Sequence, residues 1–200
     1  MSFVIAFAGF AMLHSLLASE QFKRTLFKRF PTFRFFYRSF YNLVALVSFG
    51  ILWLFVPVKS LELYSLQPPL NFLFHLIQLS GVIGIIISLK SMTGSFSGLK
   101  QLKDVFRDKK PDYYLDEPKQ EILYTNGMFA YVRHPLYTFS MLILFFHPYM
   151  SLKWLLFSVC SAVYFILGSK LEEKKLEHRF GSDYLKYKSN VPAFIPRLIK

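Results

Sequence analysis

The chain has 200 residues, of which 54% are hydrophobic and 19% aromatic, and it carries a formal net charge of +12. This length suits one compact domain, but so apolar a composition, arranged in long unbroken runs, excludes an ordinary soluble domain. Because the basic residues flank the apolar runs, the charge favours a membrane surface as partner, and we expect no nucleic acid. The single cysteine, Cys160, excludes an intrachain disulfide and a cysteine-based metal motif.

Five apolar segments are candidate membrane spans, since a span needs about 20 mostly apolar residues. In chain order they are residues 2–18, 40–58, 70–89, a short run that begins after Pro135 and stops near residues 147–148, and residues 152–169. The first has no basic stretch before it and no small-residue cleavage pattern, so we expect a retained span and not a signal peptide. The short fourth run is expected to form a tight hairpin with the fifth.

Basic residues then predict the orientation of these spans. All but two of the 24 Lys and Arg residues lie in the first loop, in the segment between the third and fourth spans, or after the fifth span. The two exceptions, Lys59 and Lys153, belong to the opposite side. The positive-inside rule places the basic side in the cytoplasm, so the C-terminus is predicted to be cytoplasmic and the N-terminus outside.

The sequence therefore predicts an all-α, polytopic membrane protein of about five transmembrane helices, with a C-terminal helical hairpin and a cytoplasmic helical tail. We expect one membrane domain over residues 1–200. Its parts are three N-terminal spans (1–90), a polar cytoplasmic connection (91–126) that Pro111 and Pro118 break, and the hairpin with its tail (127–200). Within the third span, Gly81 and Gly84 favour a close helix–helix contact.

The densest chemical signal precedes the fourth span. Asn126-Gly127 is typical of a turn, and Pro135 suits the first turn of a helix, where its missing N–H costs nothing. Arg133 and His134 would then lie at a helix N-terminus, which favours an anionic group, and Arg133 adds a forked cation that suits a carboxylate. The structural alternative is that Arg133 only anchors the helix at the headgroups and that His134 only caps it.

A second signal, Glu172-Glu173, follows the fifth span directly. Paired acids are a poor anchor at a cytoplasmic interface, where anionic lipids favour cations. We expect the helix to continue past the membrane, so that the acids lie either on a solvated face or in a polar pocket that receives a cationic ligand group.

Together these stretches resemble the isoprenylcysteine carboxyl methyltransferase family of integral membrane proteins and its bacterial relatives. The matching elements cover about residues 122–198: Gly127, the run Tyr131-Val-Arg133-His134-Pro135-x-Tyr137, Glu172-Glu173-x-x-Leu176, Phe180-Gly181-x-x-Tyr184-x-x-Tyr187, and the closing Val191-Pro192 and Ile195-Pro196. In the N-terminal half, His14 within Leu13–Ala18 and Tyr37-Arg38-x-x-Tyr41-Asn42 are similar to the methanethiol S-methyltransferase and NnrU-like branch.

The resemblance implies a methyltransferase (EC 2.1.1 class) that uses S-adenosylmethionine without a Rossmann domain. Residues carried over by position as catalytic are Arg133, His134 and Glu173. Those carried over as cofactor-binding are Tyr131, Arg133, His134, Pro135, Tyr137, Glu172 and Glu173, with Tyr184, Tyr187 and Asn190 as further candidates. We expect Arg133 and His134 to hold the donor's carboxylate, and Glu172 or Glu173 to meet its amino group or a ribose hydroxyl.

The acceptor stays open between a carboxylate such as that of a prenylated cysteine, a small thiol and a lipid amine, with the N-terminal likeness favouring a small or lipophilic thiol. Three other classes stay open: a non-catalytic NnrU-like factor for respiratory enzyme maturation, a haem- or metal-binding protein that uses His14 or His75, and a structural protein that binds anionic membrane lipids. No metal ligand set is assigned, since the five histidines are scattered. A bacterial inner membrane is the predicted location.

Overall fold

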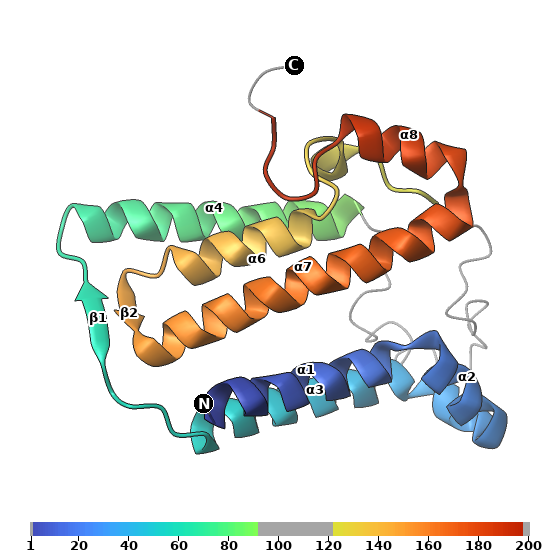
Figure 1. The fold of residues 1–200 in the computed structure, drawn as a ribbon, viewed down its shortest axis with the longest axis horizontal. Helices are drawn as coiled ribbons and strands as arrows, with labels where there is room; N and C mark the ends of the chain where they lie inside the picture. Colours follow the sequence, from blue (N-terminus) through green and yellow to red (C-terminus); the bar gives the residue numbers. More distant parts are fainter. Residues whose placement is uncertain (1, 92–121, 198–200) are drawn as a thin grey trace, which may run out of the picture. The chain divides into compact units, whose positions relative to one another are not determined.

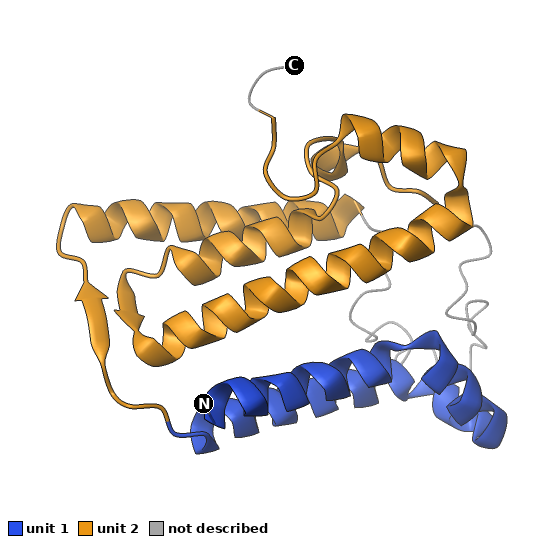
Figure 2. Cartoon of the chain, in the orientation of Figure 1, with its two compact units in different colours: residues 1–57, 95–121 blue, residues 58–94, 122–200 orange. Residues whose placement is uncertain are grey.

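A computed structural model describes residues 2–91 and 122–197 and is mostly helical (Figure 1). The chain forms two compact units, whose described parts are residues 2–57 and residues 58–91 with 122–197 (Figure 2). The third predicted span thus groups with the C-terminal half of the chain. The predicted breaks at Pro111 and Pro118 lie outside the described residues.

Unit 1 contains helices α1 (Ser2–Ala18), α2 (Glu20–Arg29) and α3 (Tyr37–Phe55), with the short 3-10 helix η1 (Pro31–Phe35) before α3. Helix α1 packs against α3. Ser19 caps α2, because its side chain accepts a hydrogen bond from the Phe22 N–H at 3.3 Å. The chain bends by 60° between α1 and α2.

Unit 2 contains helices α4 (Leu70–Ser91), α6 (Pro135–Phe145), α7 (Leu152–Phe180) and α8 (Ser182–Asn190), with the 3-10 helix η2 (Gly127–Ala130) before α6. Helix α6 packs on α4 and on α7, which confirms the C-terminal hairpin (Figure 1). Helix α7 continues past its apolar part to Phe180, as expected. Helix α8 folds back at the end of the unit that lies far from β1 and β2.

Two short strands correct the all-α prediction in one detail. Strand β1 (Glu62–Ser65) pairs antiparallel with β2 (Tyr149–Ser151), with Tyr64 opposite Met150. The pairing ties the loop before α4 to the turn between α6 and α7. It escaped prediction because each strand is too short to show an alternating pattern.

Within residues 2–91 and 122–197, three helices are long and apolar enough to cross a membrane: α3, α4 and α7. The bent pair α1–α2 passes the same test only when taken as one span, and α6, with 11 residues, is shorter than a span requires. Helices therefore occupy all five predicted segments, while three or four of them meet the criteria for a span.

Large apolar side chains on these helices face outward. Leu46, Leu54 and Phe55 on α3 are 68%, 75% and 76% exposed. A helix that shows so much apolar surface is unfavourable in water and is stable in lipid. These helices are those of an integral membrane protein.

Helices α4 and α6 approach closely at the two glycines that the sequence singled out. A Cβ atom at Gly84 would lie 2.4 Å from Cδ1 of Phe139, and one at Gly81 would lie 2.8 Å from Cγ1 of Ile143. Both glycines are buried. The predicted close-packing role is confirmed.

We expect Gly84→Ala to lower the stability of the protein by about 1–3 kcal/mol, because the new methyl group overlaps the Cγ, Cδ1 and Cε1 atoms of the Phe139 ring. Thermal unfolding in detergent measures the change. Gly168→Ala is the matched control, since it lies in α7 of the same unit and has nothing within 4 Å of its added Cβ. Equal melting temperatures for the two variants would contradict this prediction, because they would show that α4 and α6 can accommodate the added methyl group without loss of stability.

Candidate functional site

The site begins at the turn that leads into α6. Gly127 has φ +63°, a left-handed conformation that glycine adopts easily, so the predicted Asn126-Gly127 turn is present. Pro135 occupies the first turn of α6, as predicted, and is buried. Arg133 and His134 therefore precede the helix directly, and the His134 side chain is 4% exposed.

The C-terminal tail lies against this turn. The backbone N–H groups of Arg133 and His134 donate to the carbonyl oxygens of Pro192 (2.8 Å) and Ala193 (3.0 Å). The Thr138 hydroxyl donates to the Phe194 carbonyl at 2.9 Å. Two of the N–H groups next to the predicted anion site are thus hydrogen bonded within the chain, and the tail closes over the start of α6.

A carboxylate of α7, Glu173, is the centre of the site. Its Oε1 accepts hydrogen bonds from Arg133 Nε (2.9 Å) and Nη2 (2.7 Å) and lies 3.0 Å from His134 Nε2. Its Oε2 lies 3.0 Å from the Lys188 ammonium of α8. The side chains of Glu173 and Arg133 are 10% and 11% exposed. The Arg133–Glu173 pair is thus buried, and such a pair is stable only because each charge has a partner, while Lys188 reaches it from a side chain that is 37% exposed.

Arg133 also holds the tail directly. Its Nη1 donates to the carbonyl oxygens of Lys188 (3.1 Å) and Val191. One guanidinium therefore links α7, α8 and the residues after α8. The sequence predicted that Arg133 binds the carboxylate of a ligand. In this structure, the carboxylate that Arg133 binds is that of Glu173 in the same chain.

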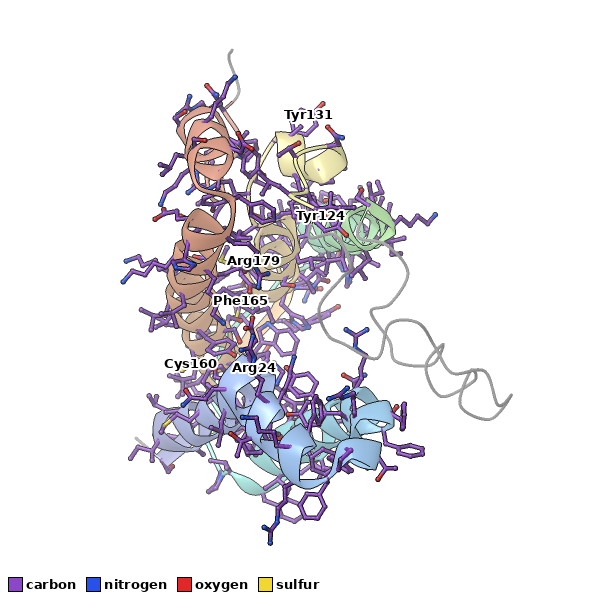
Figure 3. The ribbon with its side chains drawn as sticks, turned by 90° about the vertical axis from the view of Figure 1, so that its right-hand side faces the viewer. Arg24, Tyr124, Tyr131, Cys160, Phe165 and Arg179 are labelled. Carbon is purple, nitrogen blue, oxygen red and sulfur yellow. The ribbon has the colours of Figure 1, made fainter. Side chains whose placement is uncertain are left out.

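Glu172 differs from its neighbour because its side chain is half exposed. Its Oε2 accepts a hydrogen bond from the Tyr137 hydroxyl at 3.2 Å and lies 3.6 Å from His134 Nδ1. The Tyr137 ring stacks on His134 (5.5 Å between centroids, 10° between planes) and on Phe165 of α7 (5.0 Å, 6°), which Figure 3 labels. Stacking fixes the ring and aims its hydroxyl at Glu172.

Tyr184 on α8 is fully buried, and its hydroxyl has no hydrogen-bond partner among the described residues. Burial, and then the negative charge of Glu173, raise the pKa of Tyr184 to about 12. The phenol is thus protonated at neutral pH and can donate. A buried hydroxyl without a partner costs about 1–3 kcal/mol, so this phenol has a hydrogen bond to offer to a water or to a ligand group.

The other tail residues support this arrangement. The Tyr187 hydroxyl donates to the Phe129 carbonyl at 2.6 Å, and burial raises the pKa of Tyr187 to about 12. Hydrogen bonds to Glu177 and Glu173 raise the pKa of Lys188, so its ammonium stays charged. Both residues hold α8 in place over the turn.

The structure brings together most of the residues that the sequence predicted for the site, and two lie apart. Tyr131 is 66% exposed and projects outward from the turn after η2 (Figure 3). Asn190 is exposed, and its side-chain amide donates to the Lys186 carbonyl in its own helix at 2.8 Å. Their predicted roles stay predictions.

Sequence analysis missed Lys188 and Glu177 as parts of this site. A signal was available in the helical spacing. Lys188 lies four residues after Tyr184, and Glu177 lies four after Glu173, so each shares a helix face with a predicted site residue.

Elsewhere, His14 of α1 lies 2.6 Å from the Tyr41 hydroxyl of α3, measured from its Nε2. This is an interhelical contact of the kind expected for a lone histidine within a span. Among residues 2–91 and 122–197, no group of three His, Cys, Asp or Glu side chains is arranged to hold a metal ion.

The fold and the site together define an integral membrane protein with a buried charge cluster at one end of a helical hairpin. Comparison with curated proteins then gives its relatives. The chain is 29% identical over 200 residues to a methanethiol S-methyltransferase from Pseudomonas deceptionensis, an alignment that covers 98% of the chain and 72% of that protein.

A methanethiol S-methyltransferase from Crocosphaera subtropica is 28% identical over 94% of the chain and 71% of its own length. Methanethiol S-methyltransferase 1 from Bradyrhizobium diazoefficiens is 28% identical over 96% of the chain and 65% of its own length. No family model matches the chain, and no solved structure matches it significantly. The predicted resemblance to membrane methyltransferases is confirmed, and it extends over nearly the whole chain.

Proposed function

We propose that this chain is an S-adenosylmethionine-dependent methyltransferase of the membrane that acts on a thiol or carboxylate, with a small thiol as the favoured acceptor. The observation that carries the proposal is the buried Arg133–Glu173 ion pair, joined by Lys188, beside the Tyr184 hydroxyl, which has no hydrogen-bond partner among the described residues. It stands at the motifs that resemble the methyltransferase family, and the relatives are named for methyl transfer to methanethiol.

The residues present fit the donor's polar groups. S-adenosylmethionine carries an ammonium, a carboxylate and ribose hydroxyls. The half-exposed Glu172 carboxylate can accept from the ammonium or a ribose hydroxyl, and the Tyr184 phenol can donate to an oxygen. Because Glu173 and the tail carbonyls already engage Arg133, we assign Arg133 and Glu173 to positioning the site, with a ligand carboxylate as a further partner of Arg133.

When bound, the donor supplies a methyl group on a sulfonium. The protein's task is to align donor and acceptor and to exclude water. The tail closed over α6 and the stacked His134–Tyr137–Phe165 rings serve that task. A thiol acceptor must lose its proton, and His134, whose Nδ1 faces the half-exposed Glu172, is the group placed to take it.

The non-catalytic NnrU-like alternative predicts no donor binding. No comparison favours it, since the relatives that match along the chain are named as methyltransferases. Donor binding therefore separates the two functions.

We expect the detergent-purified protein to bind S-adenosylhomocysteine in isothermal titration. Tyr184→Phe should weaken binding by about threefold to tenfold, the value of one hydrogen bond, and Glu172→Gln by about tenfold or more because that bond is charge-assisted. Tyr149→Phe, on β2 at the far end of the unit, is the matched control and should bind as wild type does.

Transfer of a labelled methyl group to methanethiol, to longer thiols and to carboxylates then identifies the acceptor. If the folded wild-type protein did not bind S-adenosylhomocysteine, the enzyme proposal would be contradicted. The non-catalytic NnrU-like role in respiratory enzyme maturation would then be favoured. Donor binding with no transfer to any thiol would contradict only the choice of acceptor.

A further inference from the structure

Unit 1 contains an apolar pocket that the proposed methyl transfer does not use. It is a cavity of about 570 Å³ at the place where the end of α1, helix α2, η1 and the start of α3 meet. Its lining is apolar apart from Thr32, and five phenylalanines dominate it. The lining residues are Leu17, Phe22, Leu26, Phe30, Thr32, Phe33, Phe36 and Phe40. The volume is that of an ordinary ligand site. We call it the Phe pocket.

The chain around the Phe pocket is strongly basic. Residues 20–38 contain six cationic side chains against one acid, Glu20; the six are Lys23, Arg24, Lys28, Arg29, Arg34 and Arg38. Such a segment at the end of an apolar helix is complementary to an anionic lipid surface. The positive-inside prediction puts it at the cytoplasmic leaflet, which is rich in such lipids.

Two of these arginines have a buried nitrogen that donates no hydrogen bond within the described residues. Arg34 Nε and Arg38 Nη1 are buried and have no hydrogen-bond partner among the described residues. The Arg34 guanidinium lies over the Phe27 ring at 5.4 Å, which orients it without satisfying its N–H groups. Arg34 lies between Phe33 and Phe36 in the chain, and Arg38 lies two residues before Phe40, so both are close in sequence to residues that line the pocket. A buried cationic N–H without an acceptor is costly, and an anionic oxygen would remove that cost.

The shape of the segment suits the membrane interface. Helix α2 turns away from α1 by 60°, directs Phe22 and Leu26 to the pocket, and carries Lys23, Arg24, Lys28 and Arg29. A short amphipathic helix that bends off the end of an apolar helix is typical of segments that lie in the plane of the headgroups. The pocket would then open at the depth where lipid headgroups meet acyl chains.

We propose that unit 1 binds an anionic phospholipid, with an acyl chain in the Phe pocket and the phosphate at Arg34 and Arg38. A soluble anion would leave the pocket without an occupant, and a zwitterionic lipid would bring a second cation, its headgroup ammonium, into a segment that is already strongly basic. This lipid site uses none of the residues assigned to the donor site in unit 2. The lipid-binding proposal therefore does not depend on the methyl-transfer proposal.

Native mass spectrometry of the full chain, released from detergent, tests the site with phosphatidylglycerol and with phosphatidylcholine of the same acyl chains. We expect wild type to retain one phosphatidylglycerol at least about tenfold more strongly than phosphatidylcholine. Arg34→Gln with Arg38→Gln should abolish that preference. Lys28→Gln with Arg29→Gln removes the same amount of positive charge from the same segment. This variant should keep most of the preference for phosphatidylglycerol.

Thr32→Trp tests the chain-binding part separately, because it fills the pocket from an exposed position and leaves both arginines in place. We expect it to reduce retention of both lipids. Equal losses in the two charge variants would overturn the proposal, since surface charge alone would then explain binding. Displacement of the lipid by glycerol phosphate, which has the headgroup without the chains, would also overturn it and indicate a site for a soluble anion.

Discussion

Replacing Glu173 with glutamine is expected to have the largest effect on this protein, costing about 3–5 kcal/mol of stability and abolishing donor binding. The carboxylate is the shared partner of Arg133, His134 and Lys188, and its side chain is only 10% exposed. A neutral amide keeps the shape and leaves the buried Arg133 charge without a counter-charge. Thermal unfolding in detergent and titration with S-adenosylhomocysteine measure the two losses.

Glu177→Gln is the matched control on the same helix. Glu177 lies 2.6 Å from the Lys188 ammonium, but both side chains are about one-third exposed, so this ion pair is worth at most about 1 kcal/mol. If Glu173→Gln melted no lower than Glu177→Gln, the cluster would not be the structural centre of the tail. If it melted lower and still bound the donor normally, the cluster would only stabilise the fold.

The helices were predictable because a membrane imposes a simple requirement on sequence. An apolar run near 20 residues long is readable without any tertiary information, and α3, α4 and α7 follow such runs. Pro135 marked the start of α6, and Gly127 marked the turn before it, since each has a backbone preference of its own. The pairing of Tyr64 with Met150 had no such local signal.

For the site, the sequence could predict which residues matter and could not predict what they contact. Arg133 was expected to hold a ligand carboxylate, and in the fold it holds Glu173, 40 residues away. That contact depends on how α7 packs on α6, which no local pattern encodes. Tyr184 entered the prediction through the resemblance alone, whereas its burial with an unpartnered hydroxyl is a tertiary property.

In unit 1, too, the sequence did not predict a binding site. In the sequence, its basic residues predict the orientation of the spans and a membrane surface as partner, without indicating a particular binding site. The structure adds that Arg34 and Arg38 carry buried N–H groups and lie close in sequence to the phenylalanines that line a cavity. A charge count describes a surface, and only the packing of aromatic side chains around it can turn that surface into a specific site.

Arg133→Lys is expected to release the tail and weaken donor binding by about tenfold or more, although it keeps the positive charge. The guanidinium donates from Nε and Nη2 to Glu173 and from Nη1 to the carbonyls of Lys188 and Val191. A lysine ammonium is a point charge that cannot span these acceptors, so it would satisfy the carboxylate and leave the two carbonyls without a donor. Hydrogen exchange of the His134 amide, which donates to the Ala193 carbonyl, should then accelerate by about tenfold or more.

Arg179→Lys makes the same chemical change at an exposed arginine near the end of α7 and should leave both exchange and binding unaltered (Figure 3). The comparison separates two physical accounts of Arg133. If its charge alone matters, Arg133→Lys will bind S-adenosylhomocysteine as wild type does and keep its tail protected, and the positioning role is wrong. If the geometry of the guanidinium donors matters, Arg133→Lys will lower both the protection of the His134 amide from hydrogen exchange and the affinity for the donor. The two will fall together because the guanidinium that holds the tail over α6 also fixes Glu173 and, through it, the environment of Tyr184.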